Sequence, residues 1–417
     1  QQGRGFTTEV APAHGCRMDD SVCIQCGQCI NACPTAAITE HTFTDSVWRA
    51  LADPKKHVVV QTAPAIRATV GEGFGMPPGT PATGKLVTAL RRLGFDRIFD
   101  TNFTADLTIV EEATELLNRI QQGGPLPLLT SCSPGWVNFL EKFYPELIPH
   151  ASSCRSPMSM MSSLLKTWYA EQNNIDPKDI FVVAVMPCTA KKYESRRKEF
   201  LMDDGTPETD AVITTRELVW MIKNYGINFV GLPDGDFDSP LGESSGAGDI
   251  FGTTGGVMEA ALRMAVEKIT GKPPENLEFT EVRAVEGLRE RELKVSDDLT
   301  LRVGVTNGLT NAKHLLDAVV NKEKEFHIIE IMACPGGCIG GGGQPYPPRG
   351  YRIFDKNLLA KRASALYAID KGKTLRSSNH NPAIQRLYDE FLGEPGGEKA
   401  HHLLHTHYEP KLPRGIR

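Results

Sequence analysis

The sequence lacks three features, and each absence excludes a class of protein. None of its apolar runs approaches the length needed to cross a membrane. Basic residues are not in excess: the 417-residue chain carries a formal net charge of -5, so its charge balance does not favour nucleic acid as a partner. The first residues show no signal-peptide pattern. We therefore expect no membrane span and no nucleic-acid partner, and a cytoplasmic location.

The chain also lacks an initial methionine, because it begins Gln1-Gln2-Gly3. Such a start is typical of a fragment or a processed form, from which any upstream targeting signal would be missing. With 417 residues the chain is too long for one small core, so we expect two or three lobes. Its 40% apolar and 23% charged residues are ordinary for a globular protein.

Cysteine, by contrast, is present in quantity and unevenly placed. The ten cysteines are Cys16, Cys23, Cys26, Cys29, Cys33, Cys132, Cys154, Cys188, Cys334 and Cys338. Clusters of this kind, in a chain of this size, favour metal ligation over a disulfide framework.

The first 40 residues contain the spacing of a bacterial ferredoxin, Cys23-x2-Cys26-x2-Cys29-x3-Cys33-Pro34. Only one such motif is present. Either all four thiolates bind one 4Fe-4S cluster, or Cys33 serves a second cluster whose motif lies upstream. Cys16 has the wrong spacing to belong to the motif. A zinc site is disfavoured, because zinc sites prefer two separated cysteine pairs.

From about residue 56, short apolar strand patterns alternate with helical patterns. The expected strands are 56–61, 97–100, 126–129, 180–185, 211–215, 278–284, 300–306 and 327–333; the expected helices include 83–93 (with Thr83 as N-cap), 108–120, 217–225, 256–270 and 310–321. This alternation predicts an α/β fold with two lobes built on mainly parallel sheets.

Three of the expected strands end at a cysteine, namely Cys132, Cys188 and Cys334. Open α/β sheets bind ligands at the carboxyl ends of their strands, so three separated strand ends can converge on one metal site. Cys338 follows Cys334 in the same glycine-rich turn, and two thiolates from one tight turn suit a soft metal centre. The glycine run at 340–343 predicts that its backbone comes very close to another group.

With these motifs in place, the chain resembles the catalytic subunit of the FeFe-hydrogenases. Two of that family's signatures are complete here: Met186-Pro-Cys-x-x-Lys-x-x-Glu194, and Glu330-x-Met-Ala-Cys-x-x-Gly-Cys-x-x-Gly-Gly-Gly-x-Pro345. The resemblance extends from the ferredoxin-like start to about residue 410. It implies a ferredoxin-like iron–sulfur segment at 1–50 and a catalytic domain at 51–345, whose two lobes enclose a buried metal cofactor. It also implies a helical segment at 346–417, similar to a region that is a separate small subunit in some members.

The resemblance implies two kinds of cofactor, a ferredoxin-type 4Fe-4S cluster and the H-cluster. The H-cluster is a 4Fe-4S cube bridged by one cysteine to a two-iron unit with CO, cyanide and a dithiolate bridge. By position, Cys188, Cys334 and Cys338 would hold the cube, with Cys338 as the bridge. Lys191 would donate a hydrogen bond to a cyanide. Other residues implied around the cofactor are Pro64, Met186, Thr189, Phe251 and Met332, with Ala65 where many members carry a serine.

The implied reaction is the reversible oxidation of dihydrogen to protons and electrons, in an anaerobic cell. Electrons would pass through the cluster of Cys23, Cys26, Cys29 and Cys33. The implied partners are ferredoxin or another redox protein, NADH- or flavin-containing subunits of a larger complex, and maturation proteins.

The remaining signature departs from the family pattern. The family usually has two adjacent cysteines, the first a proton relay and the second a cube ligand; this chain has Cys132 and Ser133. An ungapped placement makes Cys132 the relay, whereas chemistry favours four thiolates around a cube. Three interpretations stay open: Cys132 ligates the cube while Ser133 or water relays protons, Ser133 ligates through oxygen, or the chain is a low-activity or sensory relative.

The family's proton route corresponds to Glu112, Glu115 and Ser152, with Cys132 at the cofactor end. The two glutamates are three residues apart, on one helix face. Residue pattern alone favours a solvated helix face for them, whereas a relay needs partly buried carboxylates with raised pKa values.

Two other functions compete with a hydrogenase. Ser133 favours a hydrogen-sensing relative. A cytosolic iron–sulfur assembly protein of the same fold is disfavoured, because the Lys191 motif and the glycine run are complete. Among minor features, we expect His401, His402, His405 and His407 to lie in a solvated tail, and the loop at 242–246 to cover the site.

Overall fold

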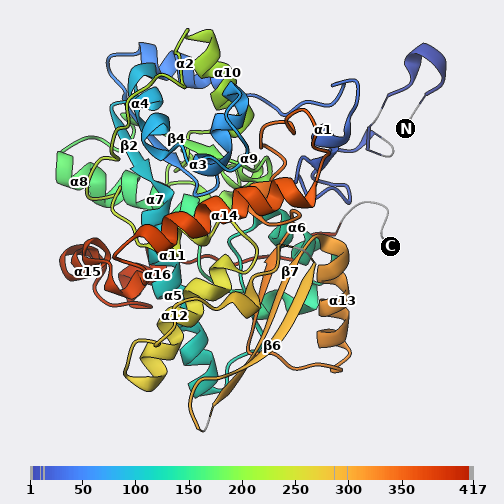
Figure 1. Cartoon of the computed structure of the whole chain (residues 1–417), viewed down its shortest axis with the longest axis vertical. Helices are drawn as coiled ribbons and strands as arrows, with labels where there is room; N and C mark the ends of the chain where they lie inside the picture. Colours follow the sequence, from blue (N-terminus) through green and yellow to red (C-terminus); the bar gives the residue numbers. More distant parts are fainter. Residues whose placement is uncertain (1–2, 10, 13–14, 286, 298, 413–417) are drawn as a thin grey trace.

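The computed structural model describes residues 3–9, 11–12, 15–285, 287–297 and 299–412. Two four-stranded sheets form the framework (Figure 1). The first has the order β2-β1-β4-β5 and is parallel throughout; the second has the order β3-β8-β7-β6, with only the β6–β7 pair antiparallel. The strands are β1 (His57–Thr62), β2 (Arg97–Asp100), β3 (Leu128–Leu129), β4 (Ile180–Met186), β5 (Ala211–Thr214), β6 (Leu288–Lys294), β7 (Thr300–Asn307) and β8 (Ile328–Met332).

Helices connect and cover the strands. Those before β4 are α1 (Gln28–Ala32), α2 (Thr44–Ala52), α3 (Ile66–Thr69), α4 (Thr83–Leu93), α5 (Thr101–Gln122), α6 (Pro134–Phe143), α7 (Pro157–Leu164) and α8 (Ala170–Asn173). Those after β4 are α9 (Ala190–Glu194), α10 (Thr215–Asn224), α11 (Gly246–Ile250), α12 (Gly256–Thr270), α13 (Leu309–Val320), α14 (Lys356–Gly372), α15 (Pro382–Leu387) and α16 (Glu398–Leu404). Among the described residues, no helix is long and apolar enough to span a membrane.

The strands of the first sheet are apolar because helices cover both of its faces. Val60 pairs with Val183 across β1 and β4, and both are fully buried. Parallel strands buried on both sides read as continuous apolar runs, which is why these strands were predictable. All strands of this sheet point the same way, so the loops after β1 and β4 emerge at one edge.

Helix α5 begins well before the expected residue 108. Asp100 caps it by accepting a hydrogen bond from the Asn102 backbone N–H. Its first two turns are buried yet carry polar side chains; the Thr104 hydroxyl, for example, donates to the Pro157 carbonyl at 2.7 Å. A helix whose buried residues are polar lacks the apolar periodicity by which helices are predicted. For this reason the beginning of α5 was missed.

Two other local predictions were wrong. The range 278–284 contains a short 3-10 helix, Thr280–Val282, and the strand follows it as β6. Strand β6 is a charged edge strand with little burial, so it lacks the apolar pattern of a strand. Thr83 is the first residue of α4 rather than its cap, which is Ala82.

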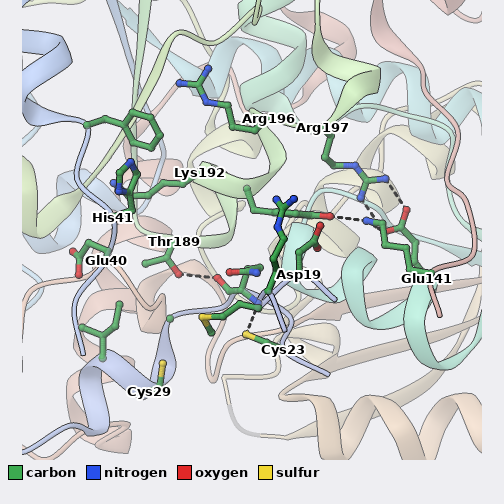
Figure 2. Close-up of a pocket in the computed structure, with 18 of the residues that line it drawn as sticks. Asp19, Cys23, Cys29, Glu40, His41, Glu141, Thr189, Lys192, Arg196 and Arg197 are labelled. Carbon is green, nitrogen blue, oxygen red and sulfur yellow. Dashed lines mark hydrogen bonds and ion pairs between the residues drawn. The ribbon is translucent and has the colours of Figure 1, made fainter. Parts of the chain in front are cut away.

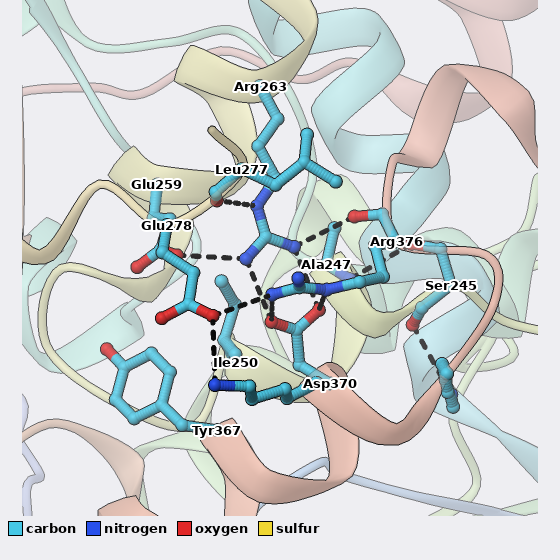
Figure 3. Close-up of polar contacts among 12 residues, drawn as sticks. Ser245, Ala247, Ile250, Glu259, Arg263, Leu277, Glu278, Tyr367, Asp370 and Arg376 are labelled. Atoms are coloured by element: carbon cyan, nitrogen blue, oxygen red, sulfur yellow. Dashed lines mark hydrogen bonds and ion pairs between the residues drawn. The ribbon is translucent and has the colours of Figure 1, made fainter. Parts of the chain in front are cut away.

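A buried charge network joins helix α14, in the C-terminal segment, to helix α12 (Figure 3). Arg263 of α12 donates to the Asp370 carboxylate of α14 at 2.9 Å, and to Glu259 at 2.9 Å. Arg376 reaches the same Asp370 carboxylate at 2.7 Å. Arg263, Glu259 and Asp370 are fully enclosed, so α14 is an integral part of the fold. The predicted class is confirmed: an α/β protein with two mainly parallel sheets and a small N-terminal segment.

Candidate functional site

An interior cavity lies where strands of both sheets end. Residues that follow β1, β3, β4 and β8 contribute to its wall, so the two sheets aim their carboxyl edges at one place. The lining residues include Cys26, Ala63, Pro64, Thr101, Cys132, Ser133, Pro134, Met158, Met186, Cys188, Lys191, Phe251, Gly252, Met332, Ala333, Cys334 and Cys338. Apart from one lysine and the cysteine and hydroxyl side chains, this wall is apolar.

Three thiols in the cavity interact through their charges. Burial raises the pKa of Cys188 to about 12, and the neighbouring Cys338 thiol adds to the effect. Burial also raises the pKa of Cys334 well above its usual value, with further contributions from Cys188 and Cys26. Burial also raises the pKa of Cys338, and the Lys191 ammonium opposes the rise in both Cys188 and Cys338. Several enclosed thiolates are stable together only with a cation between them, and this donor set fits an iron–sulfur cluster.

Glycines let the cysteine-bearing loops touch through their backbones. A Cβ at Gly341 would lie 2.1 Å from the Pro187 carbonyl oxygen, next to Cys188. A Cβ at Gly342 would lie 2.1 Å from the Cys26 carbonyl oxygen. The close backbone approach predicted for the glycine run is therefore confirmed, and the groups approached are the two other cysteine loops.

Cys132 and Ser133 face different neighbours. Burial, followed by the charge of Glu112, raises the pKa of Cys132 well above its usual value. The Ser133 hydroxyl accepts a hydrogen bond from the Ala333 backbone N–H at 3.3 Å, directly before Cys334. Both side chains line the cavity. Cys132 is thus next to a carboxylic acid, and Ser133 is next to the strand end that carries two thiols.

A carboxylic acid and its hydroxyl neighbour lead away from Cys132. Glu112 is enclosed in α5, and burial together with the charge of Glu115 raises its pKa to about 8. Ser152 donates a hydrogen bond to Glu115 Oε2 at 2.9 Å, and Arg119 donates to Glu115 Oε1 at 2.6 Å. The Glu115 side chain is 15% exposed, so this series of groups begins beside the cavity and ends near the surface. The solvated helix face favoured by residue pattern is therefore wrong for Glu112.

The N-terminal segment adjoins the cavity through its cysteine motif. Cys26 lines the cavity, and the Gln28 amide donates to the Cys334 sulfur at 3.1 Å. Lys142 of α6 donates at 2.8 Å to the carbonyls of Asp19, Ser21 and Cys23, which fixes the loop before the motif. On the outer side, Cys23 and Cys29 line a surface pocket (Figure 2). The motif thus spans the distance from the interior cavity to the surface.

Comparisons with known proteins agree with this geometry. Residues 56–342 match the iron only hydrogenase large subunit, C-terminal domain; residues 356–411 match the iron hydrogenase small subunit; residues 17–39 match the 4Fe-4S binding domain. The chain belongs to the FeFe-hydrogenase family. It is therefore an oxidoreductase that acts on hydrogen, with 4Fe-4S clusters and the H-cluster as its cofactors.

Individual relatives support the same assignment. The chain is 52% identical to the NADP-reducing hydrogenase subunit HndD of Solidesulfovibrio fructosivorans, over 97% of the chain and 69% of that protein. A variant of apo [FeFe]-hydrogenase HydA1 from Chlamydomonas reinhardtii matches with a TM-score of 0.79 and 46% identity, over 89% of this chain and all of that one. Protein NAR1 of Arabidopsis thaliana is more distant, at 32% identity over 93% of the chain and 85% of that protein.

In this FeFe-hydrogenase chain, four of the six residues predicted around the cofactor line the cavity: Pro64, Met186, Phe251 and Met332. Ala65 does not line the cavity. It is fully buried and packs in the apolar cluster that includes residues of helix α14. Thr189 also faces elsewhere, because its hydroxyl donates to the Gln25 carbonyl at 2.9 Å, in the N-terminal segment (Figure 2). The loop at 242–246 does not line the cavity either; instead Ser245 caps α11.

Two polar residues of the hydrogenase site were not identified from the sequence. Glu330 of β8 accepts hydrogen bonds from the Gly255 and Met258 backbone N–H groups, and burial raises its pKa to about 7. Gln28 donates to the Cys334 sulfur. Each residue lies inside a motif that the sequence analysis identified. Its hydrogen-bond partner comes from a distant segment and could not be predicted.

The expectation for His405 was wrong. This residue is buried, with its ring nitrogens 2.8 Å from the Ser153 hydroxyl and 2.9 Å from Glu111 Oε2. Its segment pairs with Cys154 in an isolated antiparallel bridge. His401, His402 and His407 do contact solvent, as expected.

Proposed function

We propose that this chain catalyses the reversible oxidation of dihydrogen to protons and electrons in the interior cavity. The observation that carries the proposal is the arrangement of its side chains. Cys188, Cys334, Cys338 and Ser133 surround the cavity, while Cys132 lies on the side of Glu112. One face can hold an iron cofactor, and another can exchange protons with it.

The residues present fit the H-cluster. When bound, it supplies the redox chemistry of dihydrogen at iron. Cys188, Cys334 and Cys338 would hold it through three thiolates, with Cys338 on the side of the two-iron unit. Lys191 lines the cavity, and among the described residues it forms an ion pair with Glu194 at 2.7 Å. Its remaining N–H groups can donate to an anionic ligand such as cyanide. Pro64, Met186, Phe251 and Met332 exclude water.

Ser133 would be the fourth ligand of the cube, and Cys132 would carry protons. Two observations support this division. The Ser133 hydroxyl accepts a hydrogen bond from Ala333, the residue before Cys334, whereas Glu112 makes the largest charge contribution to the raised pKa of Cys132. The protonated thiol that results can give its proton to the cofactor and recover one from Glu112.

Protons move between Cys132 and the surface through Glu112, Ser152 and Glu115. A pKa of about 8 keeps Glu112 protonated near neutral pH while its proton remains exchangeable. The Ser152 hydroxyl donates to Glu115 Oε2, and its hydrogen bonding opposes the rise in the pKa of Glu112. Ser152 therefore interacts with both carboxyl groups and can pass a proton between them.

Electrons enter through a 4Fe-4S cluster on the Cys23, Cys26, Cys29 and Cys33 motif. Cys29 is exposed, and Cys26 lines the cavity, so the motif offers both an outer and an inner end. The proposed electron partners are ferredoxin or another redox protein, or NADH- and flavin-containing subunits of a larger complex. The name of HndD, a subunit of an NADP-reducing hydrogenase, supports a multi-subunit complex linked to a nicotinamide cofactor. Maturation proteins would install the two-iron unit.

The proposed divisions of the chain are an iron–sulfur segment at 1–50, a catalytic domain at 51–345 and a C-terminal segment at 346–417. The proposed location is the cytoplasm, in an anaerobic cell. All ten cysteines lie among the described residues, and none of them forms a disulfide, as is usual in cytoplasmic proteins.

Separate Cys132→Ala and Ser133→Ala variants test the two roles. We expect the Cys132→Ala protein to keep the EPR signal of the cube and to lose hydrogen evolution from reduced methyl viologen. We expect Ser133→Ala to change the EPR signal of the cube. Loss of the cube in Cys132→Ala, with an unchanged cube in Ser133→Ala, would reverse the assignment.

A hydrogen-sensing function is the second candidate, because Ser133 replaces a thiolate of the cube. Such a protein would hold the same cofactor but turn over slowly. Hydrogen evolution by the wild-type protein separates the two: sustained evolution supports the enzyme, and an intact cofactor with almost no evolution supports the sensor.

A further inference from the structure

We propose that Glu115, Cys154 and His405 form a binding site for a soft divalent cation of the Zn²⁺ type, separate from the iron sites. One ligand atom from each of these residues lies within 4.8 Å of the other two. Cys154 Sγ and Glu115 Oε2 are 3.8 Å apart. Thiolate, imidazole and carboxylate are the three ligand types that zinc uses in proteins.

Three separate segments hold the donors in place. Glu115 is on α5, while Cys154 lies in the segment before α7 and forms the isolated antiparallel bridge with His405, after α16. Paired residues of a bridge present their side chains on the same side, which explains why this thiol and this imidazole are neighbours. The Cys154 backbone N–H donates to the Ser152 hydroxyl at 3.2 Å, which fixes the main chain that carries the thiol.

The charge around these donors favours a cation. Glu111, Glu112 and Glu115 approach from α5, and each raises the pKa of the Cys154 thiol, although burial is the largest cause. The only cation described in contact with Glu115 is Arg119, which pairs with Oε1 at 2.6 Å. Oε2 accepts hydrogen bonds from the Ser152 hydroxyl at 2.9 Å and the Ser153 backbone N–H at 3.1 Å, has no cation among its described partners, and lies on the side of Cys154. A divalent ion would replace the thiol proton and offset the excess of carboxylates.

His405 is oriented as a ligand requires. One ring nitrogen is 2.8 Å from the Ser153 hydroxyl and the other is 2.9 Å from Glu111 Oε2. A metal-bound histidine commonly keeps a hydrogen bond at its second nitrogen, which fixes the ring and its tautomer. Binding exchanges one of these two hydrogen bonds for the metal and leaves the other in place. As the metal–sulfur bond forms, the Cys154 S–H bond breaks and its proton leaves to solvent.

Occupancy of this site would close the proton route, a consequence that rests on the proposed function. Glu115 is the outer carboxylate of that route, and Ser152 donates to the same oxygen that faces Cys154. An ion on Oε2 competes with that hydrogen bond and repels protons. The inference therefore includes regulation by zinc: the cation stops proton exchange without touching the iron cofactor.

The test uses the full chain with its iron cofactors in place, dialysed against zinc chloride without oxygen. Zinc is counted by metal analysis, and X-ray absorption at the zinc edge identifies its ligands. We expect one zinc per chain, with one sulfur at about 2.3 Å and lighter ligands at about 2.0 Å. Cys154→Ser should remove the sulfur, and His405→Asn should weaken binding about tenfold or more. Cys16→Ser is the matched control. It should retain the sulfur ligand and bind zinc as tightly as the wild type.

Activity provides an independent readout. Zinc should suppress hydrogen evolution in the wild type and in Cys16→Ser, and suppress it much less in Cys154→Ser, each protein compared with itself without zinc. Zinc-edge X-ray absorption that shows no sulfur ligand would overturn the proposed site. An absorption spectrum that is the same in Cys154→Ser as in the wild type would also overturn it. Zinc bound through Cys154 with full hydrogen evolution would keep the site and overturn the role of Glu115 in proton transfer.

Discussion

At the residue scale, the proposed proton route depends on one enclosed carboxylic acid, Glu112 of α5. Its charge raises the pKa of the Cys132 thiol, and its own environment favours the protonated form. Its pKa of about 8 comes from burial and from Glu115, with Ser152 opposing the shift. A group that titrates near the working pH can both accept and return a proton.

Glu112→Gln should therefore lower hydrogen evolution by about 100-fold or more, because the amide cannot release a proton. The infrared and EPR spectra of the cofactor should stay unchanged, since Glu112 does not ligate it. Glu146→Gln, at an exposed glutamate, is the matched control and should evolve hydrogen at the wild-type rate. Full activity in Glu112→Gln would remove this residue from the route.

The pH dependence follows from the same pKa. Below about 8 Glu112 holds its proton, and above this pH it is ionised. Hydrogen evolution consumes protons, so its rate should fall as the pH rises through about 8. This break should be absent from the residual activity of Glu112→Gln, measured over the same pH range. A break of equal position and size in both proteins would assign it to another group.

At the element scale, the cofactor wall depends on loops that meet through glycine. Gly341→Ala would place a methyl group 2.1 Å from the Pro187 carbonyl oxygen and push apart the loops that carry Cys188 and Cys338. We expect this variant to bind less iron in the cavity. Gly372→Ala, where a Cβ meets nothing within 4 Å, should bind the wild-type amount. Iron analysis of the two purified proteins measures this difference. Equal iron contents would contradict the prediction.

The contact between α12 and α14 gives a second prediction at this scale. Asp370→Asn would leave Arg263 enclosed without its full counter-charge (Figure 3). Removing one partner of a buried ion pair should cost about 3 kcal/mol or more in the free energy of unfolding. Urea unfolding without oxygen, followed by tryptophan fluorescence, should show a lower midpoint. Asp297→Asn, in an exposed pair, is the control. Matching midpoints for the two variants would show that the network contributes little.

The element scale also shows what the sequence could predict. β1, β4 and β8 were found because buried parallel strands are continuous apolar runs, and Cys188 and Cys334 were placed correctly at their ends. β6 was missed because an edge strand needs no such run. The burial of Glu112 and of His405 could not be predicted, since it depends on segments distant in the chain that pack over them.

At the scale of the whole molecule, the two sheets and the N-terminal segment meet around one cavity. β4 brings Cys188, while β3 and β8 bring Ser133 and Cys334; the ferredoxin-type motif brings Cys26 to the same wall. In the proposed function, electrons would arrive through that motif and protons through α5, from different elements. Thr189, which follows β4, joins the first sheet to the N-terminal segment in a way the sequence did not predict, since it donates a hydrogen bond to the Gln25 carbonyl.

The infrared spectrum of the anaerobic protein, matured with the two-iron unit, tests the central claim most directly. That claim is that the cavity of Cys188, Cys334, Cys338 and Ser133 holds an H-cluster able to turn over dihydrogen. We predict sharp CO and cyanide absorption bands that shift when the protein is exposed to hydrogen. A matured protein that shows the EPR signal of its N-terminal cluster but no CO or cyanide bands would contradict the account.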